Sequence, residues 1–191
     1  MPRLGYLLAV DPGLDLVAVA VFELDAYFRA LGTGALQATA AIRAYHDVLR
    51  FTTSAQGDDV ERAAAVGTWL GSVVRQHQPA RVWIEKPRYA GAFGKKNPRQ
   101  AADSLRKLNL ATGALAAAAL LSGAVVREIE PAGRIAGMKD AKESNRLQVN
   151  HLLRLAGRAE LKQQDCIDAI WLGVRALAAL RIRRRETATQ P

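Results

Sequence analysis

The segment "LLAVDPGLDLVAVAVFE", residues Leu7–Glu23, contains two apolar runs separated by a short polar turn. Each run has the length and the valine content of a buried strand, and Asp-Pro-Gly between them is typical of a turn. We therefore predict strands over Leu4–Val10 and Leu16–Phe22, joined as a hairpin. The turn needs only the proline and the glycine, so Asp11 at the end of a buried strand requires a separate explanation.

The composition indicates a folded protein with an anionic partner. The chain has 191 residues, of which 50% are hydrophobic, enough for one domain with a substantial core. Lys and Arg outnumber Asp and Glu by 27 to 18, which gives a net charge of +9 and favours a polyanionic partner. We predict one domain over residues 1–180, followed by a basic, flexible tail over residues 181–191.

Cysteine content and hydropathy predict the cellular location of the protein. Cys166 is the only cysteine, so an intramolecular disulfide is excluded and a cytoplasmic location is expected. The N-terminus does not have the pattern of a signal peptide. The longest apolar run, "LNLATGALAAAALLSGAVV", contains Thr, Ser and Gly, so we expect a buried helix and a strand there, and no membrane partner.

Helical and strand patterns alternate along the rest of the chain. Residues 24–58 are hard to interpret, with a possible third strand near Val48–Thr53 after a helix or an irregular insertion. Helices that alternate with buried strands predict an α/β fold, in which helices cover both faces of a mixed sheet. The predicted elements beyond residue 56 are a helix in "GDDVERAAAVGTWLGSVVRQHQP", a strand in "ARVWIEKP", a helix over Arg99–Ser122, a strand over Val125–Ile129, and helices over Ser144–Leu155 and about Asp165–Leu180.

Four acidic residues stand at the ends of these elements. Asp11 and Glu85 each follow a predicted strand, and Asp165 and Asp168 lie on one face at the start of the last helix. Parallel neighbouring strands would bring Asp11 and Glu85 to the same edge of the sheet, where open α/β sheets place their sites. The first turn of the last helix could reach the same edge.

Clustered carboxylates repel one another, and divalent cations relieve that repulsion. Oxygen ligands suit Mg²⁺ or Mn²⁺, and two such ions about 4 Å apart can clamp the attacking and leaving oxygens of a phosphodiester. Ordinary interpretations stay open for three of these residues: Asp11 as a turn residue, Glu85 as a surface carboxylate, and Asp165 as a helix cap.

The same segments resemble the RuvC family of Holliday junction resolvases, which have an RNase H-like fold. The similar segments are "AVDPGLDLVAVAV", "VWIEKP", "AADSLRKLNLATGALAAAALLSG" and "QQDCIDAIWLGVRAL". The resemblance implies a mixed five-stranded sheet with helices on both faces, and two Mg²⁺ per active site, with Mn²⁺ as a substitute. It also implies that Asp11, Glu85, Asp165 and Asp168 are the metal ligands. Basic residues near the scissile phosphate would come from "GMKDAKESNRLQV", which contains Lys139, Lys142 and Arg146.

A basic segment follows Glu85 directly and predicts a nucleic-acid surface. Basic side chains there could follow a phosphate backbone, with salt-sensitive binding. Aromatic residues on this glycine-containing loop could stack on unpaired bases, and in the resembled family an aromatic at this place wedges the junction centre. The alternative is a solvated loop whose aromatics fold onto the core. The residues are Lys86, Arg88, Tyr89, Phe93, Lys95, Lys96, Arg99, Arg106 and Lys107.

These observations predict a metal-dependent endonuclease that resolves four-way DNA junctions and leaves 5′-phosphate and 3′-hydroxyl ends, as the resemblance implies. A homodimer would match the two-fold symmetry of the junction. One possible dimer face lies on the alanine-rich central helix, which could instead cover the sheet; its residues are Ala111, Leu115, Ala118 and Ala119.

Three other functions stay open. An RNA-processing nuclease on the same fold and a non-cleaving binder of branched DNA both fit a basic protein. The strand-Asp-x-Gly-strand opening also resembles the phosphate-binding hairpin of sugar kinases and actin-like ATPases, which need two domains and a longer chain.

Overall fold

Five strands form one mixed sheet in the computed structural model, which describes residues 4–53, 57–87, 98–131 and 141–188. The strands are β1 (Tyr6–Asp11), β2 (Leu16–Glu23), β3 (Tyr45–Thr52), β4 (Arg81–Glu85) and β5 (Val126–Ile129), in the order β3-β2-β1-β4-β5. β1 pairs antiparallel with β2 and parallel with β4, while β3 and β5 form the two edges. The predicted mixed five-stranded sheet is confirmed.

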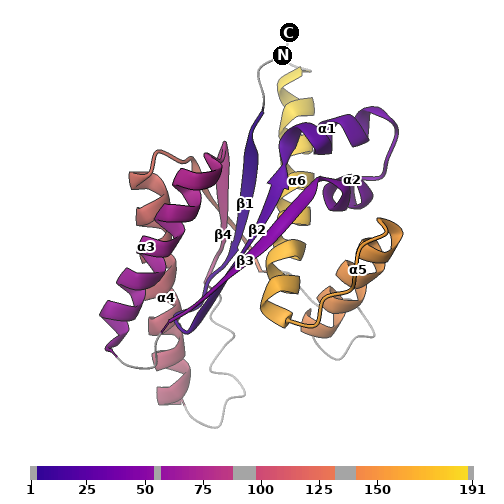
Figure 1. Ribbon diagram of the computed structural model, residues 1–191. Coiled ribbons are helices and arrows are strands. Elements are labelled where there is room, and N and C mark those ends of the chain that lie inside the picture. The colour runs from indigo at the N-terminus through magenta and orange to yellow at the C-terminus, as the bar shows by residue number, and fades with distance from the viewer. Residues whose placement is uncertain (1–3, 54–56, 88–97, 132–140, 189–191) are drawn as a thin grey trace.

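Helices cover both faces of this sheet, as Figure 1 shows. The helices are α1 (Leu24–Gly32), α2 (Gln37–Ala44), α3 (Asp59–His77), α4 (Pro98–Leu121), α5 (Ala141–Leu155) and α6 (Gln164–Ala188). α3 and α4 lie on one face, and α6 lies on the other together with α1, α2 and α5. The predicted α/β class with helices on both faces is confirmed.

The β1–β2 hairpin divides its side chains between the two cores. Leu8 and Val10 of β1 pack with Val66 and Leu70 of α3, whereas Leu7 and Ala9 pack on the α6 side. Side chains alternate along a strand, so Asp11 follows Leu7 and Ala9 onto the α6 side. The hairpin register thereby aims the carboxylate at the helix that carries the other predicted acidic residues.

Close packing holds α6 against the sheet. Gly173 of α6 faces Phe22 of β2, and a Cβ at Gly173 would overlap the Phe22 ring. The buried Tyr27 hydroxyl of α1 donates a hydrogen bond of 3.1 Å to the Leu177 carbonyl oxygen of α6. A glycine at the contact lets the helix approach closely, and the tyrosine fixes its position along its own axis.

Most predicted element boundaries lie close to the observed ones, and the largest differences fall in two places. Residues 24–53 form α1, α2 and β3, so the predicted third strand exists but begins at Tyr45 instead of near Val48. α6 continues to Ala188, past its predicted end at Leu180, so residues 181–188 of the predicted tail have a helical backbone. α3 begins at a capping box in which Asp58 accepts from the backbone of Val60 and Glu61.

The small side chains of the central helix α4 pack in the protein's own core. Ala111, Leu115 and Ala119 are fully buried against α3 and the sheet, and Ala118 is half-buried. The suggested dimer face on these residues is therefore wrong, because they already pack in the core. The alternative, that this face covers the sheet, is confirmed.

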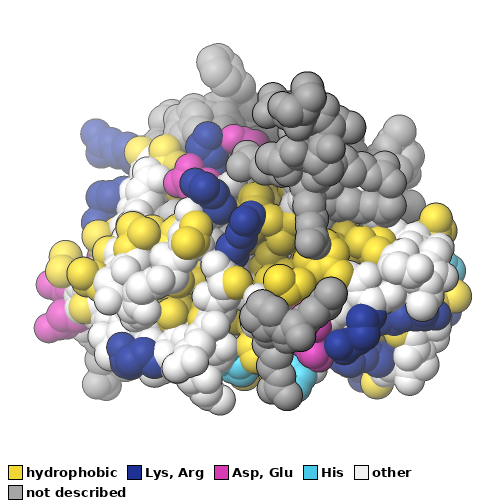
Figure 2. All heavy atoms as spheres, turned by 90° about the horizontal axis from the view of Figure 1, so that it is seen from above, with side chains coloured by type: hydrophobic (Ala, Val, Ile, Leu, Met, Phe, Trp, Pro, Cys, Tyr) yellow, Lys and Arg dark blue, Asp and Glu magenta, His cyan; other side chains and the backbone are white. Residues whose placement is uncertain are grey.

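The end of the molecule at which β1 begins carries mixed surface chemistry. Figure 2 shows apolar side chains exposed among Lys and Arg at this end. The exposed apolar side chains include Leu120 and Leu121 at the end of α4 and Val125 just before β5. Within the parts of the chain that the structure describes, no helix combines the length and the hydropathy needed to cross a membrane.

Candidate active site

Two predicted acidic residues lie at the carboxyl ends of neighbouring parallel strands. Asp11 ends β1 and Glu85 ends β4, one residue beyond the paired row Val10–Ile84. Trp83 packs in the core on the α6 side, so by alternation Glu85 lies on the same face as Asp11. The two side chains therefore share one edge and one face of the sheet.

The first turn of α6 brings two more carboxylates to this edge. Burial raises the pKa of Asp11 well above its ordinary value, and the charges of Glu85, Asp168 and Asp165 raise that pKa further. These interactions require that the three carboxylates lie near Asp11. The four residues chosen from the sequence are thus close in space, although they span 158 positions of the chain from 11 to 168.

Asp168 is held by amide donors from two helices. Its Oδ1 accepts hydrogen bonds from Asn145 Nδ2 at 2.7 Å and from Gln164 Nε2 at 3.0 Å. Burial raises the pKa of Asp168 above its ordinary value, and these two hydrogen bonds oppose that rise. Both bonds go to the same oxygen, Oδ1, and they restrict the orientation of the carboxylate.

Asn145 was not foreseen as a site residue. Its side chain is 7% exposed, and its Oδ1 is buried with no hydrogen-bond partner among the described residues. A buried amide oxygen without a partner is rare, because leaving it unpaired costs free energy. The only signal in the sequence is a polar residue at a buried position of an amphipathic helix, and many helices have one.

Asp165 forms an ion pair with Arg50 of β3. Arg50 Nε lies 2.5 Å from Asp165 Oδ2, and Arg50 Nη2 lies 3.4 Å from Oδ1. Arg50 pairs across the sheet with Ala18, which in turn pairs with Asp11, so the arginine lies in the same row as that carboxylate. Sequence analysis missed Arg50, because it lies in the segment whose pattern was hard to interpret.

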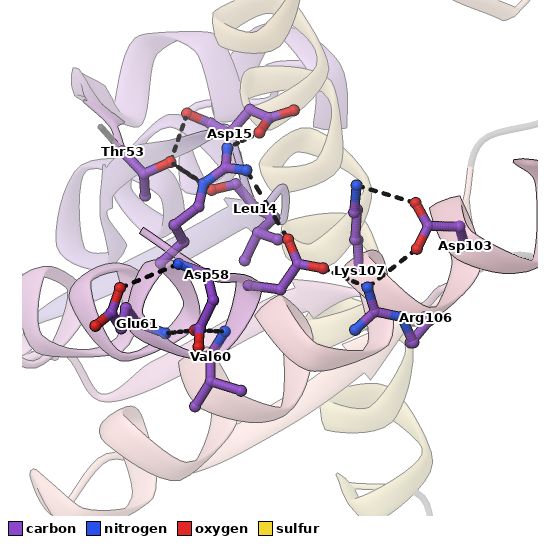
Figure 3. A network of polar contacts seen from close by, with 11 residues as sticks. Leu14, Asp15, Thr53, Asp58, Val60, Glu61, Asp103, Arg106 and Lys107 are labelled. Atoms are coloured by element: carbon purple, nitrogen blue, oxygen red, sulfur yellow. Dashed lines mark hydrogen bonds and ion pairs between the residues drawn. The ribbon is translucent and has the colours of Figure 1, made fainter. Parts of the chain in front are cut away.

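The turn that carries Asp11 is fixed by surrounding residues. A Cβ at Gly13 would overlap the Leu16 carbonyl oxygen, so the turn requires glycine. The Thr53 hydroxyl donates a 2.8 Å hydrogen bond to the Leu14 carbonyl oxygen, as Figure 3 shows, and Arg62 pairs with Asp15. These contacts hold the end of β1 rigidly.

The same network extends to two residues that the sequence assigns to nucleic-acid binding. Arg106 pairs with Asp59 and with Asp103, and Lys107 Nζ lies 2.9 Å from Asp103 Oδ2 (Figure 3). Hydrogen bonds from Lys107 and Arg106 hold the pKa of Asp103 below its ordinary value. Both cations are thus partly neutralised within the chain, which weakens the case for their contact with phosphate.

The other predicted nucleic-acid contacts have different surroundings. Lys86 is exposed and pairs with Glu130 at 3.0 Å, and Arg99 is exposed on the first turn of α4. The remaining predicted contacts lie outside the described residues; they are Arg88, Tyr89, Phe93, Lys95, Lys96 and Lys139.

Lys142 and Arg146 are both exposed on α5. The charge of Lys142 lowers the pKa of both Asp11 and Asp168, so Lys142 lies near the carboxylates. The Lys142 carbonyl oxygen also accepts a 3.2 Å hydrogen bond from Gln164, which ties the start of α5 to α6. Lys142 therefore has an electrostatic link to this edge of the sheet.

The donor set at this edge suits a hard divalent cation. It consists of carboxylate oxygens, together with the buried Asn145 Oδ1. In the described part of the chain, no three His, Cys, Asp or Glu side chains lie close enough together to hold one ion. Asp165 contacts Arg50 through both of its oxygens, so an ion that uses this carboxylate would displace the arginine.

Comparison with known proteins finds solved structures that have this fold. No protein-family model and no curated protein sequence matches the chain. Among solved structures, Thermus thermophilus RuvC superposes with a TM-score of 0.63 at 22% identity, covering 92% of this chain and 96% of that one. T. thermophilus RuvC in complex with a Holliday junction substrate gives a TM-score of 0.62 at 19% identity, covering 92% and 95%.

A eukaryotic structure matches more distantly. The yeast mitochondrial Holliday junction resolvase Ydc2 gives a TM-score of 0.53 at 12% identity, covering 95% of this chain and 83% of that one. The chain thus has the fold of RuvC-type resolvases over nearly its whole length.

Proposed function

We propose that this protein is a metal-dependent, structure-selective endonuclease that resolves four-way DNA junctions. The observation that carries the proposal is the action of Glu85, Asp165 and Asp168 on the buried Asp11 at one sheet edge. Clustered titratable groups with perturbed pKa values are typical of active sites. The fold adds support, because one structure with this fold was solved with a Holliday junction substrate.

In this proposal Asp11, Glu85, Asp165 and Asp168 hold two Mg²⁺ ions, which Mn²⁺ can replace. Such ions would activate a water molecule for in-line attack and stabilise the leaving 3′ oxygen, giving 5′-phosphate and 3′-hydroxyl ends. Asp11 is half-buried at the end of β1, on the side of the hairpin where Leu7 and Ala9 pack.

The chain's own cations would position the substrate. Lys142 lies near Asp11 and Asp168, so its ammonium group is available to a phosphate at the same edge. Arg146 lies one turn further along α5 and would contact the backbone beside it. Asn145 would keep Asp168 oriented, because it donates a hydrogen bond to one of the two carboxylate oxygens.

Junction binding would rest on charge and symmetry. The net charge of +9 favours a phosphate backbone, and binding should weaken steeply with salt. Two active sites in a homodimer would meet two strands of a two-fold symmetric junction. The interface lies elsewhere than Ala111, Leu115 and Ala119, because these are buried in the chain's own core.

A cleavage assay tests this function. The substrates are a labelled four-way junction, the matching duplex, a single strand and a structured RNA, each with Mg²⁺ or with EDTA. We expect Mg²⁺-dependent cleavage of the junction in preference to the others. Asp11→Asn should abolish cleavage and retain junction binding in Ca²⁺, while Asp47→Asn, at an exposed position on β3, should cleave like the parent.

The assay also separates the rival functions. Preferred cleavage of the RNA would favour an RNA-processing nuclease. Junction binding without cleavage in Mg²⁺ or Mn²⁺ would favour a non-catalytic binder. Full cleavage by a clean Asp11→Asn preparation would remove Asp11 from the site and overturn the mechanism.

A further inference from the structure

The Arg50 side chain crosses from the edge strand to the start of α6. Arg50 lies opposite Ala18, and Ala18 lies opposite Asp11, so the residue between the two charged side chains is small. Ala18 is fully buried and carries only a methyl group, which leaves room above it for a long side chain. The arginine uses this room to reach Asp165.

The contact engages both oxygens of the Asp165 carboxylate. Arg50 Nε and Nη2 lie 2.5 Å from Oδ2 and 3.4 Å from Oδ1, and the Cys166 thiol lies 3.7 Å from Oδ2. The Asp165 side chain is 20% exposed and the Arg50 side chain 41% exposed, so water screens the pair only in part. Charge-assisted contacts of this two-oxygen kind are among the stronger hydrogen bonds in proteins.

A guanidinium group and a divalent cation require the same lone pairs of a carboxylate, and their positive charges repel each other. We infer that Arg50 competes with a divalent cation for Asp165 and thereby sets the cation affinity of the site. This inference rests on the proposed function, in which Asp165 is a cation ligand. It assigns to Arg50 a role that raises the cation concentration needed to fill the site.

The alternative is a purely structural ion pair. In that case Arg50 only fastens the start of α6 to β3, and its removal lowers folding stability without any gain in cation affinity. The competing role therefore predicts a gain in cation affinity when Arg50 is removed, and the structural role predicts none.

Isothermal titration with Mn²⁺ tests the inference without relying on activity. The proteins are the parent chain, Arg50→Met, Asp165→Asn and the double variant Arg50→Met/Asp165→Asn. We expect Arg50→Met to bind Mn²⁺ more tightly by up to about fivefold, the fold-change that corresponds to the loss of a partly exposed ion pair. In the Asp165→Asn background the same change should have little effect, because the contested ligand is already gone.

Two further variants make the comparison sharp. Arg154→Met removes an arginine whose Nε lies 3.2 Å from Glu160 Oε1, near the far end of α5, and should leave Mn²⁺ affinity unchanged. Arg50→Lys keeps the positive charge but loses the two-pronged contact, so it should give a smaller gain than Arg50→Met. If Arg50→Met does not fold by circular dichroism, Arg50→Lys alone decides the matter.

Three results would overturn the inference. An Mn²⁺ affinity that is equal or lower in Arg50→Met and Arg50→Lys would indicate a structural pair. An equal gain with and without Asp165 would indicate a general charge effect. Absence of Mn²⁺ binding to the parent chain would overturn both it and the proposed metal-dependent function.

Discussion

Asn145 on α5 donates a 2.7 Å hydrogen bond to Asp168 on α6, and its own Oδ1 is buried with no partner among the described residues. The amide thus links two helices at the point where the carboxylates gather. Such an amide is suited to orienting the carboxylate, because it donates one hydrogen bond to it while its own oxygen stays unpaired nearby.

Asn145→Ala should lower junction cleavage by about 10- to 100-fold and raise the Mg²⁺ concentration needed for half-maximal rate. The reason is that Asp168 loses a donor that fixes its orientation. Single-turnover rates at several Mg²⁺ concentrations measure both effects. Gln148→Ala is the matched control, because Gln148 bonds to Ser144 within α5 and should leave the Mg²⁺ requirement unchanged. An unchanged Mg²⁺ requirement in Asn145→Ala would reduce Asn145 to a structural residue.

Asp11→Asn should stabilise the fold at neutral pH in EDTA, because it removes a carboxylate whose charged form is disfavoured by burial. The folded-state pKa of Asp11 is raised, so ionised Asp11 destabilises the fold above that pKa. As the pH falls from the folded-state pKa of Asp11 toward the ordinary pKa of an aspartate, Asp11 becomes protonated in the folded state and then in the unfolded state. The destabilisation caused by its charge therefore disappears. Urea denaturation at several pH values should show a gain that shrinks on acidification. A gain in Asp11→Asn that does not change with pH would contradict this prediction.

Periodic sequence patterns predicted most of the fold. The two apolar runs in Leu7–Glu23, separated by Asp-Pro-Gly, predicted both strands of the hairpin. The pattern failed in β3, where exposed and half-buried positions follow Tyr45 without strict alternation. Arg50 lies there, so its pairing with Asp165 depends on a strand order that no local pattern contains.

The sequence predicted the position of the carboxylates better than the packing partner of the central helix α4. Asp11 and Glu85 end recognisable strands, so their shared edge follows from parallel pairing. The alanine-rich face of α4 could pack either on the chain's own sheet or on a second copy of the protein, because small side chains permit close packing in both cases. Only the packed structure shows that Ala111, Leu115 and Ala119 are buried internally.

Gly13→Ala should destabilise the protein by about 2–4 kcal/mol and reduce cleavage in parallel, because the new Cβ overlaps the Leu16 carbonyl oxygen and displaces the turn after Asp11. Gly113→Ala is the control. A Cβ at Gly113 in α4 meets nothing within 4 Å, so alanine there should be neutral or stabilising by up to about 1 kcal/mol. Urea denaturation compares the two, and equal stabilities would show that the turn can relax.

Lys142→Met should reduce the single-turnover cleavage rate by about 100-fold, and Arg146→Met by less than about tenfold. Lys142 is the one of the two whose charge lowers the pKa of Asp11 and Asp168, so it is near the reacting phosphate in the proposed site. Its loss should also shift the acid limb of the pH–rate profile to higher pH, because these carboxylates then hold their protons more tightly. Measured profiles for both variants at fixed Mg²⁺ check this. A larger rate loss in Arg146→Met, with an unshifted profile in Lys142→Met, would assign the phosphate contact to Arg146.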